Sequence, residues 1–231
     1  TNKFNKVISS KITDTNKNIV LKLIKIKFKI DIKNFDLFLE TQNPKFTYKD
    51  LEIPIKDLKV YFDFTSLILS KPKIDKINLS SGKININQLK KIVVKLKPSN
   101  INSLIVNKVQ TGKLQINLEL FFENDLILKN FIAKGIVEEM KIIVDKNLSL
   151  TKTRFDFFSD NSDILIKNLK SQIEGISLKD GNIQVTKNKG INLKSNFVTN
   201  IAINKENIKN FLPFIKKNKK IFKETTLKAN L

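Results

Sequence analysis

The chain has no histidine, no cysteine and no tryptophan among its 231 residues. Without histidine or cysteine it cannot build the usual serine or cysteine triad, an ordinary zinc site or a histidine pH switch. Disulfides are excluded too, so packing and backbone hydrogen bonds alone must hold the fold. The absence of cysteine does not fix the compartment, because an oxidising space permits disulfides without requiring them.

Arginine is almost absent as well. Arg154 is the only one, so 42 of the 43 basic residues behind the net charge of +21 are lysine. The chain also has 34 isoleucines and 28 asparagines. Lysine, isoleucine and asparagine all have A/T-rich codons, and their abundance is typical of a genome of low G+C content. Proteins that read nucleic acid normally use arginine for bidentate contacts to guanine and phosphate. The charge therefore favours a compositional origin, and we expect no nucleic-acid partner.

Groups that could do chemistry are sparse. Six glycines leave little room for a glycine-rich phosphate loop. Glu138 and Glu139 are adjacent, so on a strand they are expected to point to opposite faces. Asp160-Asn161-Ser162-Asp163 is typical of a turn, and a calcium loop would need more oxygen ligands. We predict no catalytic residue, no metal site, no cofactor and no enzymatic activity.

Long hydrophobic runs are missing, since no stretch approaches the ~20 apolar residues of a membrane span. The chain starts at Thr1 without an initiator methionine or a signal peptide. The end, from Thr225 to Leu231, is typical of the first half of another strand. We expect a piece truncated at both ends.

What is present in abundance is alternation. The strongest case is the apolar set Ile24, Ile26, Phe28, Ile30 and Ile32, which alternates with charged residues up to position 33. This period of two predicts a ten-residue strand with one apolar and one charged face. Alternation continues to about residue 86 and again from about 109 to 203.

A short phrase recurs within these stretches. Ser81-Gly82, Thr111-Gly112 and Asp180-Gly181 are each followed by a polar residue and then by an apolar–polar–apolar triplet. Glycine can adopt positive φ, so each phrase predicts a tight turn after which a strand restarts. Unequal spacing argues against a strict solenoid repeat. Ordinary hairpin turns and shared repeat ancestry both stay open.

Helical spacing interrupts the strands twice, at about 87–107 as a helical pair and at about 205–217. No linker divides the chain, so we predict one continuous unit over 1–231. The predicted fold class is mainly β with a few short helices: a long, twisted antiparallel sheet forming an open, groove-like layer. The sequence is rich in phenylalanine, with 17 residues, and its few short helices cannot cover a whole sheet. The apolar face must therefore pack on another sheet, close on itself or hold an apolar ligand.

The stretch from Asp57 to Ile86 resembles the N-terminal signature of the AsmA-like bacterial envelope proteins, a group that includes AsmA, TamB and YhdP. The resemblance rests on a Ser-Leu-apolar turn at Ser66-Leu67-Ile68 and on Leu79 before a small, polar turn. The strands at 24–39 and Leu51–Ile55 match the family's opening order. Residues 113–203 resemble the long middle region of the YhdP-like branch.

This resemblance implies a non-enzymatic segment of a protein anchored in the inner membrane of a Gram-negative bacterium. Its periplasmic β-groove would move phospholipids toward the outer membrane and support envelope integrity. The N-terminal anchor of the family is missing here. Phospholipid acyl chains are the implied partners, and Ile24, Ile26, Phe28, Ile30 and Ile32 are the predicted lipid-facing residues, although the same stripe would also suit a closed core.

Two other functions remain open from the sequence. A structural or adhesive β-domain of a surface protein would have its apolar face fully covered. A basic nucleic-acid-binding module would gather its lysines on one face with exposed aromatic residues.

Overall fold

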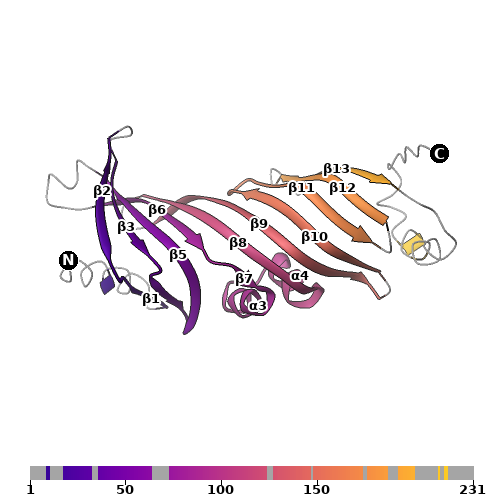
Figure 1. Ribbon diagram of the computed structural model, residues 1–231, viewed down its shortest axis with the longest axis horizontal. Helices are drawn as coiled ribbons and strands as arrows, with labels where there is room; N and C mark the ends of the chain where they lie inside the picture. The colour runs from indigo at the N-terminus through magenta and orange to yellow at the C-terminus, as the bar shows by residue number, and fades with distance from the viewer. Residues whose placement is uncertain are drawn as a thin grey trace.

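The computed structural model describes residues 9–10, 18–32, 36–63, 73–123, 127–146, 148–173, 176–186, 192–200, 213 and 216–217. Within these ranges thirteen strands form one large, open antiparallel sheet, accompanied by two short helices (Figure 1). The predicted fold class is therefore confirmed. The strands cross a long, twisted sheet, and the chain progresses from one end of that sheet to the other.

The strands follow one another across the sheet almost in chain order. Their bounds are β1 Ile19–Lys22, β2 Ile26–Asp31, β3 Asp36–Gln42, β4 Lys45–Tyr48, β5 Leu51–Phe62, β6 Ile74–Ser81, β7 Ile84–Asn85, β8 Val109–Phe122, β9 Leu128–Asp145, β10 Leu148–Ser159, β11 Asp163–Ile173, β12 Ile176–Thr186 and β13 Asn192–Asn200. From β5 onward the order is β5-β6-β8-β9-β10-β11-β12-β13, with β7 beside β8. Such a meander needs only short connections between neighbouring strands.

Two strands near the start of the sheet are interrupted at the same level. β1 pairs with β4, and β2 pairs with β3. β4 in turn pairs with the first half of β5, and β3 pairs with its second half. The break at 23–25 therefore lies opposite the break at Asn43-Pro44. Proline cannot donate a ladder hydrogen bond, and Asn43 has a φ of 47°. The predicted ten-residue strand starting at Ile24 is wrong for this reason: β2 begins only at Ile26.

A line of β-bulges crosses the later strands. Each of β9, β10, β11 and β12 carries one extra residue relative to its neighbours, and each of these residues has a φ between 49° and 54°. The four bulged residues are Glu139, Lys152, Asn168 and Asp180. Bulges bend a strand and increase its twist, so bulges aligned across successive strands bend the whole sheet along one line.

None of the recurring glycine phrases lies at a hairpin turn, and those of Gly112 and Gly181 lie at this line of bulges. Gly112 lies inside β8 with a φ of 153°, Gly181 lies inside β12, and Gly82 separates β6 from β7. The expectation of a tight turn is wrong in all three places. Hairpin turns and bulges both favour a small residue near a left-handed position, so the local sequence does not distinguish them.

The two helices connect β7 to β8 and lie along one rim of the sheet (Figure 1). α3 spans Ile86–Lys95 and starts with a capping box between Asn85 and Gln88. α4 spans Asn100–Lys108 and is capped by Ser99. They occupy the part of the chain for which a helical pair is predicted. The predicted helix at 205–217 falls on residues of which only Pro213, Lys216 and Lys217 are described, and the Ser66-Leu67-Ile68 turn lies outside the described residues.

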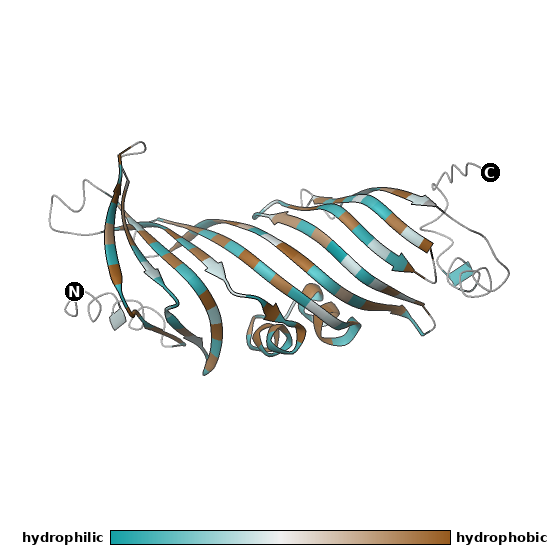
Figure 2. Cartoon of the chain, in the orientation of Figure 1, coloured by the Kyte–Doolittle hydropathy of each residue, from teal (hydrophilic) through white to brown (hydrophobic). Residues whose placement is uncertain are grey.

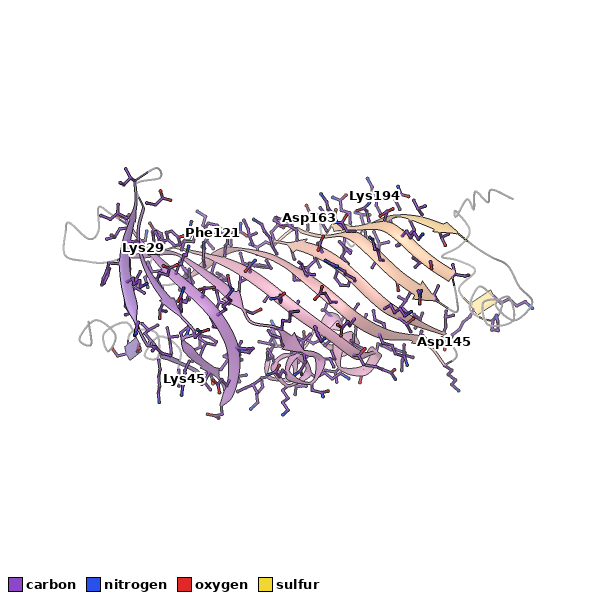
Figure 3. The ribbon with its side chains drawn as sticks, viewed as in Figure 1. Lys29, Lys45, Phe121, Asp145, Asp163 and Lys194 are labelled. Carbon is purple, nitrogen blue, oxygen red and sulfur yellow. The ribbon has the colours of Figure 1, made fainter. Side chains whose placement is uncertain are left out.

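The strand ends define two rims. Lys29, Phe121, Asp163 and Lys194 lie along the upper rim, and Lys45 and Asp145 lie toward the lower rim (Figure 3). The lower rim also carries the two helices and the Lys49-Asp50 turn between β4 and β5, where both residues have positive φ. This is the backbone of a two-residue hairpin turn.

Candidate functional site: the apolar face of the sheet

One row of paired residues crosses the sheet from β2 to β13 on a single face. Following the strand register, it runs Ile26, Thr41, Leu58, Leu79, Leu118, Ala133, Ser159, Ile164, Val185 and Leu193. Eight of these ten residues are apolar, and the other two are small hydroxyl residues. With strands ~4.8 Å apart, the row extends roughly 43 Å along the sheet. We call the face that carries this row the apolar face.

A neighbouring row extends the same face toward the lower rim. It runs Ile116, Gly135, Phe157, Ile166, Ile183 and Ser195. The ring of Phe157 lies over Gly135, where a Cβ atom would stand 2.6 Å from Cε1 of that ring. Phe197 covers Gly181 in the same way, at 2.7 Å from Cδ1. An aromatic ring over a strand glycine fills the space of its missing side chain and keeps the surface apolar.

The apolar face is not covered equally along its length. On β3 and β5, Leu39, Leu58 and Val60 are at most 4 % exposed and belong to a core cluster that includes Leu21 and Leu23. Each strand contacts its sheet neighbours, and the helices make their main contacts with β5, β7, β8 and β9 among the strands described. In the middle of the sheet the apolar residues are half-buried by one another, whereas polar neighbours such as Gln115 and Asn117 are exposed. The face is most open toward the upper rim of β2 and in β13, where Ile30 is 68 % and Leu193 64 % exposed.

Small hydroxyl side chains line the bend on this face. Thr41, Ser81, Thr153 and Ser171 are all at least 95 % buried. Ser81 Oγ accepts the backbone N–H of Ile116 at 3.0 Å, and the hydroxyls of Thr153 and Ser171 are 2.7 Å apart. A bulge interrupts the ladder, and the hydroxyls of Ser81, Thr153 and Ser171 supply hydrogen-bond partners near such interruptions, whereas the hydroxyl of Thr41 has none among the described residues. The bend is thus satisfied without charged groups on the apolar face.

The opposite face is charged, and we call it the polar face. Its ion pairs join neighbouring strands, as between Lys134 and Glu119 at 3.6 Å and between Lys113 and Glu139 at 2.7 Å. Its aromatic residues are covered by lysines: Lys134 Nζ lies 5.9 Å from the ring centre of Phe158. The alternation of hydrophobic and hydrophilic residues along each strand is visible in Figure 2. The sheet therefore separates an apolar from a charged surface over its whole length.

The five predicted lipid-facing residues are not placed alike. Ile26 is buried in a core cluster with Leu21, Leu23 and Leu39. Phe28 and Ile30 continue the apolar face toward the upper rim and are 50 % and 68 % exposed. Ile24 lies in the break before β2 and is 55 % exposed. The alternation predicts a core position for Ile24, but Leu23 occupies that position instead. Ile32 follows the end of β2 and is 78 % exposed.

The adjacent carboxylates Glu138 and Glu139 form ion pairs on the polar face. Glu138 and Glu139 do not point to opposite faces, because the bulge at Glu139 places both on the polar face between Val137 and Met140. A hydrogen bond from Lys113 holds the pKa of Glu139 below its ordinary value, while Glu138 pairs with Lys83 and Arg154. A carboxylate that donates or accepts protons in catalysis would instead need a pKa raised toward neutral pH.

Asp160 closes the turn between β10 and β11, as predicted. Its Oδ1 accepts the backbone N–H groups of Ser162 and Asp163, both at 2.8 Å. Within the described ranges no cluster of three acidic, histidine or cysteine side chains could hold a metal ion. Of the helices described, none is both long and apolar enough to cross a bilayer.

Sequence reasoning missed most of the apolar face. The signal was present in β8, where Leu114, Ile116, Leu118 and Leu120 alternate strictly with polar residues. In later strands the signal is blurred, because the alternation shifts at each bulge and apolar-face residues there are three apart. Val137 and Met140 show this spacing, as do Ile166 and Leu169.

Comparisons with protein-family models, with curated proteins and with solved structures find no match to this chain.

Proposed function

We propose that the apolar face holds the acyl chains of phospholipids and that the chain is a non-enzymatic segment of an AsmA-like lipid-transfer protein. In this proposal the full protein is anchored to the inner membrane, and the sheet forms part of a groove through the periplasm that supplies the outer membrane. The observation that carries it is the part of the row from Leu79 to Leu193, which is free of charge across seven strands and continues the buried residues Ile26, Thr41 and Leu58. The resemblance to AsmA-like envelope proteins supports the envelope location.

The length of this row suits passage of lipids in succession. A single leaflet contributes about half of the ~30 Å hydrocarbon thickness of a bilayer. The part of the row from Leu79 to Leu193, at roughly 29 Å, is longer than one extended acyl chain by this measure. More than one lipid could therefore occupy the face, one after another.

The energetics favour transfer rather than permanent capture. Each sheltered methylene gains about 0.8 kcal/mol, so a dozen of them gain roughly 10 kcal/mol relative to water. The bilayer offers the same methylenes a similar gain. Because the apolar face has no ionic or covalent trap, an acyl chain can leave it for a membrane at little net cost. Selectivity would then depend on the width and shape of the face.

Mass spectrometry of organic extracts from the purified protein tests this function. We expect phospholipid to copurify with the wild-type chain and to be lost in Leu118→Asp, which places a charge in the middle of the row. The matched control is Asn117→Asp, on the polar face of the same strand, which should keep its lipid. A folded protein without lipid would instead favour a structural β-domain whose apolar face is covered by polypeptide.

A further inference from the structure

The helices carry a second exposed surface, separate from the apolar face. Val94 of α3 is 69 % exposed, and Leu96 after its end is 43 % exposed. On α4, Ile101 and Leu104 are 55 % and 49 % exposed. Single exposed apolar residues are normal on protein surfaces, but four within eleven residues are a concentration. We call these four, with Lys90, Lys91, Lys97 and Lys108, the helix-pair surface.

These apolar side chains are not needed to attach the helices to the sheet. Ile86 and Val93 of α3 are buried, and so is Val109 at the end of α4. Residues Ile101, Leu104 and Lys108 follow the three- and four-residue spacing of one helix face, and that face points away from the packed side. The exposed set therefore has no structural task within the described part of the chain.

The stretch of sequence that carries the two helices has charge of one sign. No acidic residue occurs from Lys76 to Leu118, a stretch that contains eight lysines. On the polar face, by contrast, lysines such as Lys134 have glutamate partners. Lys90, Lys91, Lys97 and Lys108 form no ion pair with the described residues. The helix-pair surface is thus complementary to an anionic surface.

We infer that the helix-pair surface docks onto a bilayer that contains anionic phospholipid. The apolar residues would enter the interfacial layer, and the lysines would contact phosphate groups. Basic amphipathic helices too short to span a bilayer bind in this way, and each lysine near an anionic membrane adds to the affinity. The inference is independent of the proposed function, because docking requires no lipid on the apolar face.

The pair is held in a fixed orientation relative to the sheet. Lys49 Nζ donates to the carbonyl of Lys95 at 2.8 Å, and Lys95 Nζ donates to the carbonyl of Lys49 at 3.0 Å. Asn102 Nδ2 donates to the carbonyl of Lys97 at 2.9 Å and so fixes the connection between the helices. Docking through these helices would therefore set the lower rim of the sheet against the membrane.

A tryptophan reporter tests the docking directly, since the chain has no tryptophan of its own. Leu104→Trp places the reporter on the helix-pair surface, and Ile136→Trp places the control on the polar face, where Ile136 is 37 % exposed. The probe is a vesicle of phosphatidylcholine with about one-third phosphatidylglycerol. We expect a blue shift and quenching by brominated acyl chains at position 104 and neither at position 136. No signal at position 104 would overturn the inference and favour an acidic protein partner. Equal signals at both positions would overturn it too, because they would show a general attraction of the basic chain to the vesicle.

Charge variants separate docking from the general attraction of a basic protein. Replacing Lys90, Lys91, Lys97 and Lys108 by Gln should weaken vesicle binding at least tenfold. The matched control replaces Lys167, Lys170, Lys179 and Lys194, four exposed lysines of the polar face, and should have a much smaller effect. Ile101→Ser with Leu104→Ser should also weaken binding without changing the charge. Equal losses in the two lysine sets would contradict docking through the helices.

Discussion

Phe157 of β10 lies across Gly135 of β9, so close that a Cβ atom at position 135 would stand 2.6 Å from the phenylalanine ring and would also clash with the carbonyl oxygen of Gln115. The ring completes the apolar face where the glycine leaves a gap. The carbonyl contact belongs to the backbone of the neighbouring strand, so a rotation of Phe157 alone cannot make room for a side chain.

Gly135→Ala should therefore destabilise the protein by about 1–3 kcal/mol, because overpacking must displace a strand. Denaturant unfolding measures the difference. Gly82→Ala is the control, since a Cβ there meets its nearest atom, Cβ of Pro54, at an ordinary 3.7 Å. Equal losses of stability in the two variants would show that the close packing at Gly135 is not as described.

The line of bulges predicts a gain of stability from a glycine. Lys152 is exposed and has a φ of 49°. This conformation is strained for a residue with a Cβ atom but nearly free of strain for glycine. Lys152→Gly should raise the free energy of unfolding by about 0.5–1 kcal/mol, measured by urea unfolding. Lys167→Gly, at an exposed residue of β11 whose own φ is not positive, should lower it. A loss at both positions would argue against the bulge in β10.

The ion pair between Lys29 and Glu40 predicts a pH dependence of stability. A hydrogen bond from Lys29 lowers the pKa of Glu40, whose side chain is 15 % exposed. A carboxylate with a lowered pKa in the folded state stabilises the protein above its unfolded pKa of about 4.3, and this contribution is lost as the pH falls through the folded value. Glu40→Gln should therefore cost about 0.5–1 kcal/mol at pH 7.

That cost should shrink as the pH falls below the folded pKa of Glu40, so the stability curves of wild type and Glu40→Gln should converge in acid. Chemical unfolding at a series of pH values measures this. A constant offset between the two curves would mean that the ionised form of Glu40 contributes nothing specific.

Much of the fold follows from local patterns in the chain. Strict alternation in β8 and the helical spacing of Leu89, Ile92 and Val93 predict a sheet and a helix because each depends on burying one side of a regular element. The bulges depend on more than local sequence. Lys152 and Asn168 adopt left-handed conformations because neighbouring strands carry the same irregularity, which one strand alone does not reveal.

The same limit explains the error at Ile24. Its alternation with Ile26 is real in the sequence, but Pro44 on the paired strand interrupts the ladder and moves Leu23 into the core instead. Exposure of the apolar face was equally beyond local reasoning. Whether Ile30 or Leu193 is covered depends on which elements pack on the sheet, and alternation predicts only that the two share the character of a buried face.

Phe157 and Phe158 offer the most direct measurement of the central claim, that the apolar face holds acyl chains. They are adjacent residues of one type, half-buried on the apolar and polar faces respectively. Each is replaced in turn by the photoreactive benzoylphenylalanine, and the protein is irradiated in cells and analysed by mass spectrometry. The account predicts phospholipid adducts at position 157 and few or none at position 158. Equal lipid adducts at both positions, or adducts to polypeptide alone at position 157, would contradict it.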